Sequence, residues 1–256
     1  EEATEAAANI LRAGGNAFDA AVGAVFTSMT SEYSLTGAGG GGAMMIRISG
    51  EDPILYDFFV DTPPRIGDEE LDFFSVEVDF GDSKQIFHIG KGSAAIPGTL
   101  LGLFTIQKQF GVLPLPIVLE PAIYLARKGS ILNRQQAYIF KILEPIFSHT
   151  LEGRNLFYSQ GKILKKGDRF INADFADFLD RVSKEGVSFF YDGDCSELIE
   201  KHFGDGGLLN KKVMRDYHVA VRKPVITSFM DTTIYSNPVP SVGGTLIIFL
   251  LRLLEE

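Results

Sequence analysis

The 256-residue chain has few of the residues that build metal sites and disulfides. Its single cysteine, Cys195, excludes an intrachain disulfide and a cysteine-based zinc site. The four histidines, at positions 88, 149, 202 and 218, lie far apart and have no metal-ligand spacing. We therefore expect no metal and no cofactor. A lone thiol also favours a reducing compartment such as the cytoplasm.

Basic patches and long apolar runs are also missing. The chain has 24 basic and 33 acidic residues, a net charge of -9, and its basic runs are no longer than pairs such as Lys165-Lys166. This pattern argues against nucleic acid or an anionic membrane as a partner. The longest apolar run, Leu246–Leu251, is far short of the roughly 20 residues that cross a bilayer.

What the chain does have is enough apolar sequence, 45% of its residues, to bury a sizeable core. It opens inside a helix-like stretch, EEATEAAANIL, without an initiator methionine, and closes on a second one, LIIFLLRLLEE. No linker or repeat divides it. We expect residues 1–256 to form one incomplete domain of a longer polypeptide.

Local patterns predict a mixture of helices and strands. Gly14-Gly15 stops a first helix over 3–12, and Asn16 with Asp19 forms a near capping box for the next. Segments 43–48 and 54–60 flank a turn and predict a β-hairpin. Further strands are expected within 71–96, 219–229 and 232–237. Helical patterns cover 100–111, 117–129, 134–147, 174–186 and 195–204.

A glycine-rich run, TGAGGGGAMMI, includes Gly37, Gly39 and Gly42 at the spacing of a dinucleotide-binding turn. Such a turn runs from strand to helix, whereas here a helix precedes and a strand follows. Nucleotide binding is therefore not expected. The glycine loop, Gly39, Gly40, Gly41 and Gly42, has two interpretations. It permits close backbone packing with unusual dihedral angles, or its N–H groups form an anion nest or oxyanion donors.

Several separated segments, in order, resemble landmarks of the gamma-glutamyltranspeptidase family. They are ATEAAANILRAGGNAFDAAVGA (3–24), TGAGGGGAMMI (36–46), AIPGTLLGL (95–103), EPAIYLARKG (120–129), GDRFINADFADFLDRVSKEGVSFFYDG (167–193), DYHVAVRKPV (216–225) and NPVPSVGG (237–244).

The resemblance implies an α+β, N-terminal-nucleophile hydrolase fold, a four-layer αββα sandwich. In this family a precursor cleaves itself, and the new N-terminal threonine of the small subunit attacks a gamma-glutamyl amide such as glutathione. The chain resembles most of the large subunit, so no catalytic residue is expected in it. The implied partners are the small subunit and a small amide or peptide substrate. A higher oligomer is left open. Family members are often periplasmic or secreted.

One departure from the family pattern concerns substrate binding. The family reads D-F-R-E-T-A-P where this chain has Asp57 to Pro63, and its arginine binds the glutamyl alpha-carboxylate; here Phe59 takes that place. Alternation puts Leu55, Asp57, Phe59 and Asp61 on one strand face. We expect Asp57, Phe59 and Asp61 to line the site, unless Phe59 is simply buried. Arg47 or Arg65 are candidates to supply the missing charge.

The phenylalanine at position 59 leaves three functions open. One is a gamma-glutamyl hydrolase or acyltransferase, and another is an acylase or amidase of the same fold with a different acyl group. The third is a catalytically silent homologue with a binding or structural role.

Thr232 and Thr233 resemble the family's cleavage site but precede NPVPSVGG, so they are predicted to be strand residues. Roles in capping, at helix ends and in turns explain the acidic residues Asp19, Glu120 and Asp192 as well as catalysis does. The acidic residues on helix faces, Asp174, Asp177 and Asp180, are expected on the surface.

Overall fold

A computed structural model describes residues 1–65, 67 and 70–255. The predicted pair of N-terminal helices, separated at Gly14-Gly15, is confirmed. Helix α1 (Glu2–Arg12) ends before Gly14, which has a φ of 93°, and α2 (Ala17–Ser31) follows. The Asn16 side chain accepts from the N–H of Asp19, and the Asp19 carboxylate accepts from the N–H of Asn16. This reciprocal capping box fixes where α2 begins.

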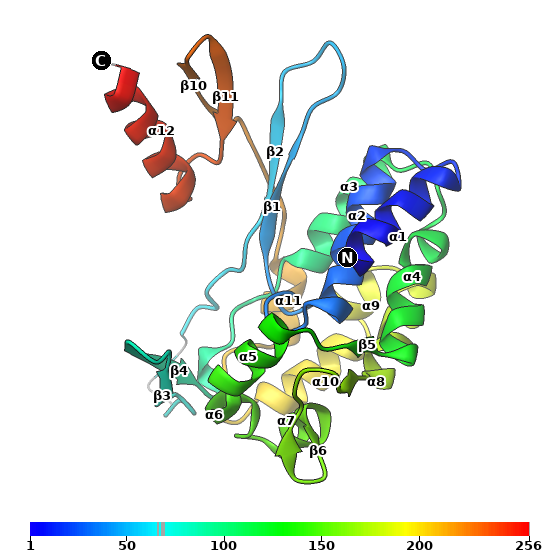
Figure 1. Cartoon of the computed structure of the whole chain (residues 1–256), viewed down its shortest axis with the longest axis vertical. Helices are drawn as coiled ribbons and strands as arrows, with labels where there is room; N and C mark the ends of the chain where they lie inside the picture. Colours follow the sequence, from blue (N-terminus) through cyan, green and yellow to red (C-terminus); the bar gives the residue numbers. More distant parts are fainter. Residues whose placement is uncertain (66, 68–69, 256) are drawn as a thin grey trace.

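The main core lies among helices that pack around α2 (Figure 1). α3 (Thr99–Phe110) and α4 (Leu115–Lys128) pack against α2, and α8 (Ala173–Glu185) packs against α4. Most of the fully buried side chains on these helices are apolar. They include Val22, Phe26, Met29, Leu100, Leu103, Ile106, Val118, Leu119 and Leu179.

A second, smaller core is aromatic. It lies where α5 (Arg134–Ile142), α6 (Glu144–Phe147) and α7 (Leu151–Phe157) meet short strand pairs. The pairs are β5 (Ser130–Ile131) with β8 (Arg169–Phe170), and β6 (Tyr158–Ser159) with β7 (Lys162–Ile163). The single helical pattern predicted over 134–147 is wrong in one respect. It breaks at Leu143, because Pro145 has no N–H to continue α5 and instead lies in the first turn of α6.

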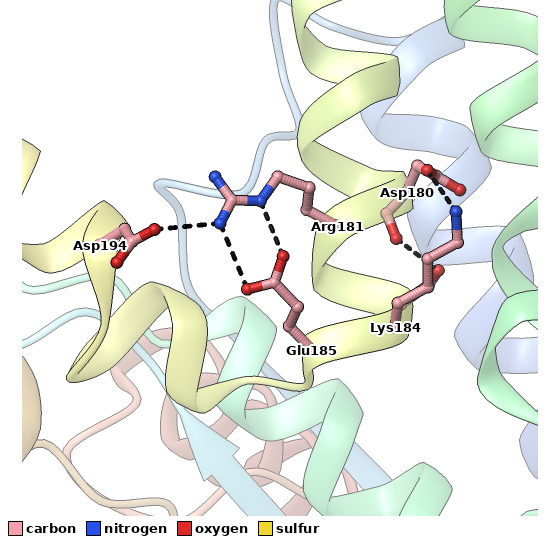
Figure 2. A network of polar contacts seen from close by, with 6 residues as sticks. Asp180, Arg181, Lys184, Glu185 and Asp194 are labelled. Atoms are coloured by element: carbon pink, nitrogen blue, oxygen red, sulfur yellow. Dashed lines mark hydrogen bonds and ion pairs between the residues drawn. The ribbon is translucent and has the colours of Figure 1, made fainter.

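Short helices then lead back toward the sheet: α9 (Ser188–Tyr191), α10 (Asp194–Phe203) and α11 (Lys211–Asp216). Figure 2 shows how α10 is tied to α8: Arg181 bonds both carboxylate oxygens of Glu185 at 2.8 and 3.2 Å, and Asp194 at 3.1 Å. Lys184 pairs with Asp180 one turn apart on α8. These groups are largely exposed, so the network orients the two helices more than it stabilises them.

The predicted hairpin forms two strands of a three-stranded antiparallel sheet, in the order β1 (Gly42–Ile46), β2 (Ile54–Phe58), β9 (Ala220–Arg222), with β2 at the centre. α3 packs against β1 and β2. Only part of 71–96 is strand, namely β3 (Phe74–Asp79) and β4 (Lys84–Ile89), followed by the short 3-10 helix η1 (Lys91–Ser93). Leu55, which alternation places on the same strand face as Asp57 and Phe59, is only 2% exposed.

The last elements project away from the helices (Figure 1). β10 (Val225–Phe229) and β11 (Thr232–Ser236) form a hairpin, and α12 (Val242–Glu255) packs against β10. Thr232 and Thr233 lie in β11, as predicted. No helix in the described ranges is both long and apolar enough to cross a membrane.

Candidate functional site

The glycine loop and the end of β2 lie against each other. Gly42 pairs with Phe58 in the sheet, which sets Gly41 beside Phe59. A Cβ on Gly41 would lie 2.4 Å from the Val60 nitrogen and 2.9 Å from the Phe59 Cα. Close packing is therefore the reason for glycine at position 41. The expected unusual dihedral angles are wrong, because none of Gly39 to Gly42 has a positive φ.

The carbonyl oxygen of Gly40 anchors the loop to the start of α3. It accepts from the N–H of Gly98 at 2.9 Å and from that of Thr99 at 3.1 Å, while the Gly40 N–H donates to Gly37. An anion nest needs N–H groups that point at a ligand. The N–H groups of Gly40, Gly98 and Thr99 are already bonded within the protein, so they do not support that interpretation.

Of the three residues predicted to line the site, Phe59 lies beside Gly41, and Asp57 pairs with Ala43 just after the loop. The two carboxylate oxygens of Asp57 have different donors: Oδ1 accepts from the Phe59 N–H at 3.1 Å, and Oδ2 accepts from Arg222 Nε at 2.7 Å. Asp61 exchanges both backbone hydrogen bonds with Ile96. The Phe59 side chain is 66% exposed, so the alternative that it is simply a buried aromatic is wrong for this chain.

Arg47 is not brought to these residues. The hairpin ladder ends at the pair Ile46 and Ile54, and Arg47 follows it. Arg47 is six residues from Gly41, which corresponds to about 20 Å along a strand. It therefore lies at the other end of the hairpin from Phe59.

Two residues that the sequence did not single out hold the end of β2. One is Arg222, the partner of Asp57, and the other is Tyr217, whose hydroxyl donates to the Phe59 carbonyl at 2.7 Å. Burial, with the charges of Asp57 and Asp61, raises the pKa of Tyr217 to about 12, so it stays a hydrogen-bond donor. Both residues lie in the landmark DYHVAVRKPV. That segment was the only signal for them, because the hairpin is more than 150 residues away.

A second tyrosine supports the first. Tyr191 stacks on Tyr217 with ring centroids 6.1 Å apart, and its hydroxyl donates to the Pro97 carbonyl at 2.7 Å. A Cβ on Gly98 would lie 2.1 Å from both the Tyr217 hydroxyl and the Phe58 carbonyl. The position after Pro97 therefore has to be glycine for Tyr217 to reach Phe59.

The other acidic candidates have structural partners or exposed positions. Asp19 is fully buried as part of the α2 capping box, Asp177 pairs with Arg127 on the surface, and Glu120 and Asp192 are exposed. In the part of the chain that the structure describes, no three His, Cys, Asp or Glu residues are grouped to hold a metal ion.

Comparison with solved structures gives the class of the protein. The chain superposes on the crystal structure of Helicobacter pylori gamma-glutamyltranspeptidase with a TM-score of 0.87 and 29% identity, covering 99% of this chain and 72% of that one. The fold is thus that of the N-terminal-nucleophile hydrolases, as predicted. The gamma-glutamyltranspeptidase family model matches residues 3–256, and the chain belongs to that family.

The relatives include enzymes with two kinds of name. The chain is 32% identical to the Escherichia coli glutathione hydrolase proenzyme, over 99% of this chain and 43% of the relative. It is 30% identical to the acylase ACY 1 proenzyme of Pseudomonas sp. strain SE83, over 99% of this chain and 46% of the relative. The chain therefore spans less than half the length of these relatives.

Proposed function

We propose that this chain is the scaffold and acyl-binding half of an amide hydrolase or acyltransferase that acts on gamma-glutamyl compounds such as glutathione. The observation that carries the proposal is the packing of the glycine loop against Phe59, at the position where the family binds the acyl group. The E. coli relative's name, glutathione hydrolase proenzyme, supports the same reaction. Residues 1–256 form one incomplete domain in this proposal.

The proposal divides the roles between two subunits. The nucleophile is an N-terminal threonine on a small subunit outside this chain, so no catalytic residue is assigned within it. Asp57, Phe59 and Asp61 face the acyl group, and Gly41 lets the loop approach them. The small subunit is the implied partner because the relatives are proenzymes and the chain covers less than half of each.

A second candidate is an acylase that takes a different acyl group. Phenylalanine cannot form the charge-assisted, two-point contact that an arginine makes with a carboxylate. The exposed Phe59 side chain instead offers an apolar surface to the acyl group. The relative named acylase ACY 1 proenzyme fits this alternative.

Substituting Phe59→Arg in the full-length protein distinguishes the two candidates. We expect kcat/KM for gamma-glutamyl-p-nitroanilide to rise about 10-fold, in the range of one hydrogen bond to a charged group. The rate on hexanoyl-p-nitroanilide, whose acyl group has no carboxylate, falls or stays constant. A wild type that prefers the hexanoyl substrate supports the acylase. If Phe59→Arg changes kcat/KM for neither substrate, the side chain at position 59 does not contact the acyl group.

A further inference from the structure

Arg222 is a cation that shares a sheet face with the residues of the candidate site. It pairs with Leu55 across β9 and β2, so its side chain lies on the face that alternation assigns to Leu55, Asp57 and Phe59. That face ends at Phe59, where the family's arginine is absent. Arg222 reaches Asp57, two residues before Phe59, from a strand more than 160 residues later in the sequence.

The Asp57 carboxylate lies between the Arg222 guanidinium and the backbone of Phe59. Arg222 Nε is 2.7 Å from Asp57 Oδ2, and Asp57 Oδ1 is 3.1 Å from the Phe59 nitrogen. One carboxylate therefore separates the guanidinium from the backbone of the substituted position. Arg47, in contrast, lies at the far end of the hairpin.

The guanidinium has donors left for a ligand. An arginine carries five N–H groups, and only the Nε donor of Arg222 is bonded among the described residues. The Arg222 side chain is 38% exposed, whereas that of Asp57 is 14% exposed. Asp57 thus holds the guanidinium through Nε, and within the described residues the two terminal nitrogens make no hydrogen bond or ion pair.

We propose that Arg222 determines acyl specificity by binding the carboxylate of the acyl group, in place of the arginine that Phe59 has replaced. This inference rests on the proposed function. A guanidinium binds a carboxylate with two parallel N–H bonds, and the two terminal nitrogens of Arg222 present that geometry. Asp57 is then the residue that positions the guanidinium.

The test compares two anilides that differ by one carboxylate, gamma-glutamyl-p-nitroanilide and 4-aminobutyryl-p-nitroanilide, on the full-length protein. We expect Arg222→Gln to lower kcat/KM for the gamma-glutamyl substrate about 10- to 100-fold, mostly through KM. The value for the 4-aminobutyryl substrate, which has no carboxylate, stays within about twofold. Arg222→Lys, which keeps the charge and loses the fork, gives an intermediate loss.

Further variants separate binding from structural support. Arg127→Gln is the matched control, because Arg127 also pairs with an aspartate, Asp177, at 2.7 Å but lies on α4. Adding Phe59→Arg to Arg222→Gln restores much of the gamma-glutamyl activity if the lost group was the carboxylate-binding cation. A merely structural role for Arg222 predicts no such rescue and an equal loss on both substrates.

Each contrary outcome has a distinct meaning. An equal loss on both anilides overturns the inference and leaves the proposed function standing. The same holds if Arg65→Gln, and not Arg222→Gln, removes the preference for the carboxylate. A wild-type protein that cleaves neither anilide overturns the proposed function and the inference with it.

Discussion

Asp19 is a charged side chain with no exposed surface. Burial alone would raise the pKa of its carboxyl, but it accepts from the N–H groups of Asn16, Val112 and Leu113 and from the Gln107 side chain. These bonds outweigh the burial and hold the pKa below its ordinary value. One carboxylate therefore caps α2 and also fixes the loop that follows α3.

We expect Asp19→Asn to lower the free energy of unfolding by about 1–3 kcal/mol at pH 7, because an amide N–H group then faces buried N–H donors. The folded pKa is depressed, so the stabilisation is present above the unfolded pKa of about 4 and is lost as pH falls through the folded pKa. Urea unfolding of the full-length protein at pH 7 and at lower pH measures this.

The control for Asp19 is Asp177→Asn, which removes an exposed ion pair and costs no more than about 1 kcal/mol. A difference between the Asp19 variant and wild type that does not shrink in acid contradicts the assignment of a depressed pKa to Asp19.

At the scale of elements, the end of β2 is held by a hydroxyl from the segment after α11. Removing it with Tyr217→Phe leaves the Phe59 carbonyl without its donor, at a cost of about 0.5–1.5 kcal/mol. If Tyr217 positions Phe59 for the substrate, losing this hydrogen-bond energy raises KM for gamma-glutamyl-p-nitroanilide about 2- to 10-fold, while kcat changes less.

Tyr56, which lies in β2 itself, provides the control for Tyr217. Its hydroxyl donates to Gln109 Oε1 at 2.5 Å, and its ring is buried in the main core. Tyr56→Phe is expected to destabilise the protein to a similar extent and to leave KM alone. Equal KM values for the two variants mean that Tyr217 acts on stability alone.

Elements whose signals are local were predictable from the sequence, and contacts between distant segments were not. The Asn16 cap, the hairpin at 43–60 and the strand over Thr232 and Thr233 depend on neighbours a few residues away, and all formed. β2 pairs with β9 across more than 160 residues, so alternation could not reveal Arg222 as the partner of Asp57. For the same reason, alternation could not show that Leu55 is buried, because its neighbour on β9 comes from the same distant segment.

At the scale of the whole molecule, an apolar surface remains on the elements that project from the helices. On α12 it includes Leu246, Ile247, Phe249, Leu250, Leu253 and Leu254, each more than half exposed. Apolar surfaces of this kind mark interaction sites. In the proposed function, the small subunit of the same precursor covers them.

This proposal predicts that the full-length protein cuts itself into two fragments that remain associated. Intact-mass spectra taken over time after purification should show a single chain giving way to two, and N-terminal sequencing of the smaller fragment should begin with threonine. Size exclusion should elute both fragments together, because separation would expose the apolar face of α12 to water. A chain that stays uncut would instead favour the silent homologue, since without cleavage no N-terminal threonine amine forms to act as the base.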